Sequence, residues 1–195
     1  MRILRAAGYR VMPWKNGGGT TTEIAVSPDG AGLDNFDWRV SMARVEASGA
    51  FSSFAGIDRT LSVLEGEGIV LDIAGEPPAR LTTASAPLAF PGDVPSSAAL
   101  IGGPITDLNV MTRRGRMLHK VERRLLSDET RIVPDAETTI VLCVGTGVTL
   151  FTDDASSLEP LDALILDRGG PQLRLQPKGQ GLLFVIELHR LAANH

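Results

Sequence analysis

The chain has 195 residues, a formal net charge of −4, 43% hydrophobic and 22% charged residues, which is the composition of an ordinary soluble globular protein. This excludes a disordered or fibrous chain, and a single cysteine, Cys143, excludes an internal disulfide. No apolar run approaches the roughly 20 residues that a membrane helix needs. We therefore expect a cytoplasmic protein that binds no membrane, and the acidic balance argues against general nucleic-acid binding.

Short strands are predicted along the whole chain, because glycine and proline recur at short intervals with brief apolar or alternating runs between them. In chain order the predicted strands are 23–26, 38–45, 61–64, 69–73, 105–111, 139–144, 148–151, 163–166 and 182–189. The only candidate helix is 117–126, and its apolar period is poor. The sequence predicts an all-β fold.

An internal repeat divides the chain into two β units. The segment TLSVLEGEGIVLDI from Thr60 resembles TTIVLCVGTGVTLFT from Thr138, with Gly-x-Gly at the same place in both. Each segment predicts a hairpin that turns at its glycines, followed by a proline-led strand and a final apolar strand. The alternative is a chance resemblance between two hairpins.

Gly-x-Gly hairpins followed by a Pro-Gly-Asp turn resemble the pattern of a cupin half-barrel. We therefore predict a bicupin, with two jelly-roll-like β-barrels in one chain. Residues 1–116 would form the first barrel with the N-terminal strands and a ligand pocket. Residues 117–195 would form a linker and a second, smaller barrel.

The histidines are too few for the metal site that cupin enzymes usually carry. The chain has His119, His189 and His195, and no closely spaced histidine pair accompanies either Gly-x-Gly. We therefore predict no metal and no cofactor. The same shortage argues against a Ser-His-Asp or Cys-His mechanism, and Cys143 in the apolar run IVLCV is expected to be buried.

Polar residues gather in three segments, of which PWKNGGGTTTEI is the first. Its glycines let the backbone approach a ligand closely, and Lys15 and Asn16 place donors beside them. The alternative is a flexible turn before the strand that begins at Glu23.

The second polar segment is DWRVSMARVE, where alternation separates two strand faces. One face carries Trp38, Val40 and Met42, and the other carries Arg39, Ser41 and Ala43. The first face is apolar, whereas Arg39 on the second is either a solvated charge or a ligand contact.

The segment GAFSSFAGIDRTL follows directly and adds aromatic and charged residues. Phe51 and Phe54 either plug the core or stack on a ligand. Asp58 and Arg59 either form a local surface ion pair, which contributes little, or belong to a site.

The third polar segment is GPITDLNVMTRRG, which places Asp107, Asn109 and Met111 on one strand face. Aspartate and asparagine are poor strand formers, so their presence on one face requires a reason. A polar pocket inside the first barrel gives one, and an edge strand that faces water gives another.

The predicted linker 113–124 is strongly basic. Its basic residues are Arg113, Arg114, Arg116, Lys120, Arg123 and Arg124. A nucleic-acid footprint would need interleaved aromatic residues or a second basic patch. Since neither is present, we interpret the linker as a solvated connecting face and predict no nucleic-acid partner.

Taken together, PWKNGGGTTTEI, FDWRVSMARV, GAFSSFAGIDRTLSVLEGEG, FPGD and GPITDLNVMTRRG resemble blocks of the HutD/Ves family of cupin-like proteins. The resemblance implies a bacterial bicupin; the HutD branch is associated with histidine-utilisation operons in a regulatory or accessory role, and the Ves branch with a cold-related phenotype. It also groups the polar segments into one site. The candidate ligand-binding residues are Lys15, Asn16, Arg39, Ser41, Phe51, Arg59, Asp107 and Asn109.

These residues predict a metal-independent small-molecule-binding protein. Lys15, Arg39 and Arg59 would anchor a carboxylate, because arginine grips one with two parallel hydrogen bonds. Urocanate and formimino- or formyl-glutamate fit both the anchors and the family context.

Two other functions stay open from the sequence. One is a metal-free isomerase or hydrolase that uses Glu23, Asp58 or Asp107 as general base. The other is an interaction module that meets another protein or a second copy of the chain to form a homodimer.

Overall fold

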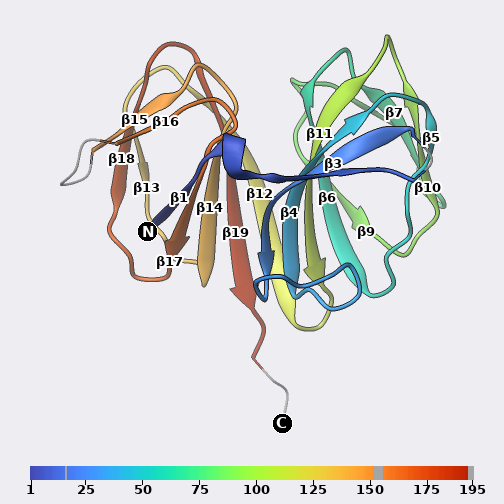
Figure 1. Ribbon diagram of the computed structural model, residues 1–195, viewed down its shortest axis with the longest axis horizontal. Helices are drawn as coiled ribbons and strands as arrows, with labels where there is room; N and C mark the ends of the chain where they lie inside the picture. The colour runs from blue at the N-terminus through green and yellow to red at the C-terminus, as the bar shows by residue number, and fades with distance from the viewer. Residues whose placement is uncertain (16, 152–155, 193–195) are drawn as a thin grey trace. The chain divides into compact units, whose positions relative to one another are not determined.

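The computed structural model describes residues 1–15, 17–151 and 156–192 (Figure 1). Within these ranges the only helical element is a short 3-10 turn, η1 (Ala6–Gly8). The described residues otherwise form strands and their connections, so the all-β prediction is confirmed. In this part of the chain no helix has the length and apolar character that crossing a membrane requires.

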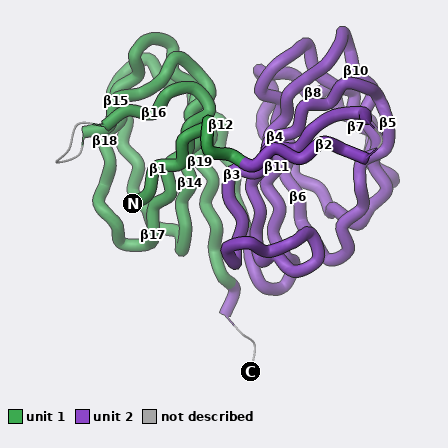
Figure 2. Tube along the Cα trace, in the orientation of Figure 1, with its two compact units in different colours: residues 1–9, 119–190 green, residues 10–118, 191–195 purple. Residues whose placement is uncertain are grey.

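The chain divides into two compact units, which Figure 2 shows in green and purple. Unit 1 comprises Met1–Tyr9 and His119–Arg190, and unit 2 comprises Arg10–Leu118 with Leu191 and Ala192. The first residues thus belong to the same unit as the second half of the chain, because β1 (Arg2–Leu4) pairs antiparallel with β17 (Ala163–Asp167).

Unit 2 contains a six-stranded sheet with the order β2-β3-β4-β11-β6-β9. Its strands are β2 (Arg10–Pro13), β3 (Gly19–Ser27), β4 (Trp38–Val45), β11 (Ile105–Arg113), β6 (Ile57–Glu65) and β9 (Leu88–Pro91). A four-stranded sheet has the order β5-β10-β7-β8. Its strands are β5 (Gly49–Ala50), β10 (Ser96–Leu100), β7 (Ile69–Ile73) and β8 (Ala79–Leu81).

The two sheets of unit 2 pack their apolar faces together. Leu61 and Val63 of β6 share one buried cluster with Ile69 and Leu71 of β7, which lies in the other sheet. Full burial of each such side chain stabilises the fold by about 1.5–3 kcal/mol. Alternation of apolar and polar residues along the strands is what places these side chains inside.

Unit 1 repeats this construction with a five-stranded sheet, β1-β17-β14-β19-β12, and a four-stranded sheet, β13-β18-β15-β16. Its other strands are β12 (Met117–Leu126), β13 (Thr130–Ile132), β14 (Thr138–Cys143), β15 (Val148–Phe151), β16 (Ser156–Leu158), β18 (Leu173–Pro177) and β19 (Gly181–Arg190). Val141, Leu164 and Leu183 pack against Leu150 and Leu175 from the other sheet. Cys143 is fully buried in the same cluster, as expected.

The internal repeat reappears as repeated topology. The order β9-β6-β11-β4 in unit 2 corresponds to β17-β14-β19-β12 in unit 1, and β5-β10-β7-β8 corresponds to β13-β18-β15-β16. The hairpin interpretation of each Gly-x-Gly is wrong, because β6 and β7 lie in different sheets, as do β14 and β15. At this crossover Gly68 has φ +112°, and a Cβ there would lie 2.1 Å from the Leu81 carbonyl oxygen.

The candidate helix 117–126 is wrong, since these residues form β12 beside β19. Sheet pairing outweighs a weak local helical pattern here. The basic segment 113–124 is therefore the end of β11, a turn and a strand rather than a free linker. Its side chains make ion pairs that include Arg114 with Asp58 and Asp93, Arg116 with Asp37, Lys120 with Glu187, and Arg124 with Glu122.

Candidate functional site

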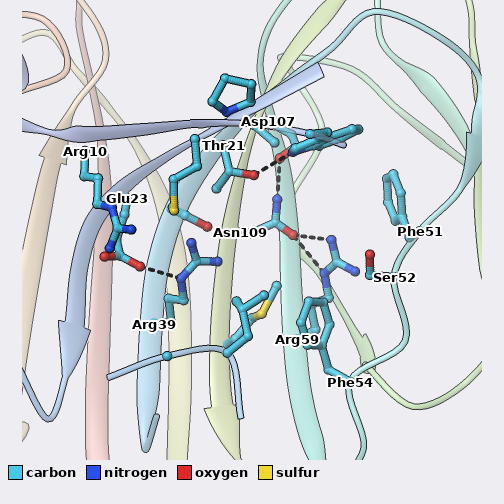
Figure 3. Close-up of a pocket in the computed structure, with 18 of the residues that line it drawn as sticks. Arg10, Thr21, Glu23, Arg39, Phe51, Ser52, Phe54, Arg59, Asp107 and Asn109 are labelled. Atoms are coloured by element: carbon cyan, nitrogen blue, oxygen red, sulfur yellow. Dashed lines mark hydrogen bonds and ion pairs between the residues drawn. The ribbon is translucent and has the colours of Figure 1, made fainter. Parts of the chain in front are cut away.

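A cavity of about 650 Å³ lies on the inner face of the six-stranded sheet of unit 2 (Figure 3). Its volume falls in the range of small-molecule sites. Strands β3, β4, β11 and β6 supply its polar floor, while β2 and two loops around Leu33 and Phe54 complete the wall.

The floor is polar because the inward faces of these strands change character along their length. On β4, Ala43 and Val45 belong to the apolar core, whereas Ser41 and Arg39 continue the same face into the cavity. The predicted alternation on this strand is confirmed, and Arg39 is 5% exposed rather than solvated. The cavity therefore begins where the inward pattern turns from apolar to polar.

Strand register places the polar side chains in rows. Ser41 pairs with Glu23 on one side and with Asn109 on the other. In the next row, Met111 of β11 lies between Arg39 and Arg59. Since β4 and β6 are separated by one strand, the two arginine Cα atoms are about 10 Å apart. β11 is thus a central strand rather than an edge strand, and Figure 3 shows both guanidinium groups in the cavity.

Arg39 is held by a carboxylate from the neighbouring strand. Its Nε donates to Glu23 Oε2 at 2.8 Å, and the side chains are 6% and 18% exposed. A bulge in β3 between Glu23 and Ala25 shifts the register beside this pair. Glu23 uses the Nε edge of the guanidinium, and the described residues offer no second hydrogen-bond acceptor to the Nη atoms.

Arg59 is the end of a buried polar chain. Its Nε and Nη2 both donate to Asn109 Oδ1, at 2.8 and 2.5 Å, and Asn109 Nδ2 donates to Asp107 Oδ1. All three residues are at least 94% buried. Of the two alternatives for Asp58 and Arg59, the local surface pair is not formed, because these neighbours point to opposite faces of β6 and Asp58 pairs with Arg114 instead.

Burial shifts the protonation of both charged ends of this chain. Desolvation lowers the pKa of Arg59 to about 10, and the negative charge of Asp107 opposes that change. Desolvation raises the pKa of Asp107 to about 7, while the charge of Arg59 and the backbone N–H of Ala43 act in the lowering direction. At neutral pH the Arg59 guanidinium is charged, and the pKa of Asp107 is raised far enough for its carboxyl group to exchange a proton in this range.

Three aromatic rings surround the Arg59 guanidinium. Its Cζ lies 4.8 Å from the ring centre of Phe51, 5.5 Å from Phe90 and 6.0 Å from Phe54, distances at which a cation and a ring attract. Phe51 and Phe54 line the cavity. They therefore act as a wall around a cation as well as packing against the core.

The loop that carries Phe51 and Phe54 is fixed from outside the cavity. Gly56 N–H donates to Asp93 Oδ2 at 3.2 Å, and Arg114 reaches Asp93 and Asp58 at 2.9 and 2.8 Å. Arg114 and the Gly56 N–H hold the pKa of Asp93 at about 2. Asp58 faces this outer cluster and is not among the residues that line the cavity.

The glycine-rich segment forms one rim. Trp14 Nε1 donates to Thr21 Oγ1 at 2.8 Å, and both residues line the cavity with Lys15. Gly19 is required by packing, since a Cβ there would lie 2.1 Å from the Arg44 carbonyl oxygen. Asn16 lies outside the described residues.

The structure brings seven of the eight predicted residues to this one cavity: Lys15, Arg39, Ser41, Phe51, Arg59, Asp107 and Asn109. Sequence reasoning left out Arg10 and Thr21, and did not foresee the pairing of Glu23 with Arg39. Alternation along YRVMPW, which places Arg10, Met12 and Trp14 on one face, is the signal that would have added the β2 side of the wall.

The charge of the cavity favours an anion. Four basic residues, Arg10, Lys15, Arg39 and Arg59, face two carboxylates, Glu23 and Asp107. Over the described ranges, no three His, Cys, Asp or Glu residues gather in a group that could hold a metal ion. The apolar walls suit the carbon body of a ligand, and the guanidinium groups suit its carboxylate.

Comparison with known proteins shows what the chain is similar to. A family model described as HutD matches residues 6–185. An uncharacterised Pseudomonas putida protein of the hutC 3′ region is 35% identical over 182 residues, which cover 92% of this chain and 94% of the relative.

Solved structures extend this similarity. A conserved Pseudomonas aeruginosa protein of unknown function has a TM-score of 0.88 at 35% identity, over 96% of this chain and 98% of that one. HutD from Pseudomonas fluorescens, solved in a formate condition, has a TM-score of 0.83 at 35% identity, over 98% and 99%. A cupin 2 barrel protein from Leptotrichia buccalis, 9% identical with a TM-score of 0.58 over 86% and 87%, shares the fold alone. The bicupin prediction is confirmed.

Proposed function

This chain belongs to the HutD family, and from that premise we propose that unit 2 binds a small carboxylate-bearing metabolite in its cavity, as an accessory protein of bacterial histidine utilisation. One observation carries the proposal: two buried arginines, Arg39 and Arg59, enter one cavity from strands two apart in the sheet. A buried guanidinium that keeps unused donors is a strong anchor for a carboxylate.

The relatives support the pathway part of the proposal. One bears a name that places its gene beside hutC, and another is named HutD. Urocanate and formimino- or formyl-glutamate are the candidate ligands, because each has a carboxylate for the arginines. The aromatic and methionine side chains of the wall, such as Phe51 and Met111, suit the body of such a molecule.

Isothermal titration calorimetry tests this function. Urocanate and N-formyl-glutamate are titrated into the wild type and into Arg39→Lys and Arg59→Lys, which keep the charge but lose the planar fork. Loss of a charge-assisted hydrogen bond is expected to weaken binding roughly 10- to 100-fold. Arg80→Lys is the matched control, because Arg80 is exposed on β8 and lies outside the cavity. Equal affinity in all four proteins would contradict the proposal.

One observation also favours a second candidate function, a metal-free enzyme. The pKa of Asp107 is raised by burial to about 7, the range in which a general base works best at neutral pH. Exchange of substrate C–H protons for deuterium, followed by NMR with each candidate ligand, tests this activity. Exchange that Asp107→Asn abolishes would support it, and no exchange above the buffer rate would exclude it for these ligands.

A further inference from the structure

The chain of Asp107, Asn109 and Arg59 couples two buried charges. Asn109 accepts two hydrogen bonds from Arg59 through Oδ1 and donates through Nδ2 to Asp107. Both ends of the amide are therefore committed, which fixes its orientation. Because all three residues are at least 94% buried, the charge on one end affects the other strongly.

The protonation of Asp107 depends on this coupling. Burial favours the neutral carboxyl group, and the charge of Arg59 favours the carboxylate; the balance leaves the pKa of Asp107 at about 7. An anion on Arg59 would offset the positive charge that stabilises the carboxylate. The pKa of Asp107 would then rise, by the roughly one unit or more that a close charge produces.

We propose that binding of an anion to Arg59 is coupled to protonation of the Asp107 carboxylate. The cavity then takes up the anion together with a proton. This inference rests on the proposed function and adds its regulation by pH. When Asp107 is ionised, its carboxylate already balances the positive charge of Arg59, and Asn109 bridges the two groups. With Asp107 protonated, the guanidinium offers a full charge to the ligand.

Other charged groups also face the cavity, so the contribution of Asp107 has to be separated from theirs. From β2, β3, β4 and β6, and from the glycine-rich rim, they are Arg10, Glu23, Arg39, Arg59 and Lys15. Arginines stay charged throughout the neutral range. The described residues of unit 2 include no histidine, so Asp107→Asn isolates the contribution of one carboxyl group.

Calorimetry with N-formyl-glutamate and with formate tests the inference, since neither probe titrates between pH 6 and 8. The titration is run at pH 7 in two buffers with different heats of ionisation, such as PIPES and Tris. From an Asp107 pKa of about 7, the wild type is expected to take up about 0.4 proton per ligand, and to bind roughly five- to tenfold more weakly at pH 8 than at pH 6. Asp107→Asn is expected to bind with no uptake and with the same affinity at both values.

The outcomes separate this inference from the function on which it rests. Binding of either probe with no buffer dependence in the wild type overturns the inference and leaves the proposed function standing. The same uptake in Asp107→Asn also overturns it, because another group then takes the proton. No binding of either probe overturns the inference, and the urocanate titration then decides the proposed function. The buffer comparison on the wild type needs no variant, so it shows whether binding takes up a proton even if Asp107→Asn folds poorly.

Discussion

The buried carboxyl group of Asp107 is expected to make the protein less stable as pH rises, without any ligand. Its pKa is raised from 3.8 to about 7 by burial, so the folded state holds this proton more tightly than the unfolded state. The stabilisation is complete below about pH 4 and is lost as pH rises through 7. A displacement of about three pKa units corresponds to about 4 kcal/mol, which is an upper value for this contribution.

Asp107→Asn removes this dependence, because an amide of the same size does not ionise. The free energy of unfolding is measured by urea titration at pH 4.5, 6 and 8 for both proteins. Between pH 4.5 and 8, the free energy of unfolding of the variant is expected to increase by a few kcal/mol relative to that of the wild type. Parallel pH profiles for the two proteins would refute the assignment of a raised pKa to this buried group.

Three further predictions concern the walls of the site. Asp93→Asn is expected to have the opposite pH dependence, losing stability relative to wild type above about pH 4, because the pKa of Asp93 is about 2 in the fold; urea titrations that show no difference at pH 6 would contradict this. Gly19→Ala is expected to cost about 1–3 kcal/mol of unfolding free energy, whereas Gly49→Ala, with open space around its Cβ, changes it little. Phe51→Leu is expected to lower the free energy of unfolding by about 1 kcal/mol beyond the loss of packing. Phe151, whose ring lies 5.3 Å from Arg174, is more exposed, so Phe151→Leu is expected to lower it less. Equal losses in the two variants would refute the buried cation–ring contact.

Much of the floor of the site was predictable, because it depends on strand alternation. Once Trp38 and Met42 are recognised as one apolar face of a strand, Arg39 and Ser41 must share the other. The same rule puts Asp107 and Asn109 on one face of β11. Family blocks then indicated that these strands contribute to one site, and all four residues line the cavity.

Features that depend on how strands meet were not predictable. The pairing of Arg39 with Glu23 follows from the register of β3 against β4, which a bulge shifts beside Glu23. The Gly-x-Gly segments read as hairpins, yet they carry the chain between sheets, because sequence shows a turn but not the partner of the next strand. Residues 117–126 form a strand for the same reason, since their partner β19 lies far along the chain.

Binding of a carboxylate by Arg39 and Arg59 can be observed on the two side chains themselves. Nitrogen-15 NMR of the arginine Nε–H groups, assigned with Arg39→Lys and Arg59→Lys, is recorded while N-formyl-glutamate or urocanate is added. If the two arginines hold the carboxylate, the Arg39 and Arg59 signals shift saturably with one common dissociation constant, and the Arg80 signal stays unchanged. Saturable binding that leaves the Arg39 and Arg59 signals in place would contradict this prediction, because the carboxylate would then be held elsewhere.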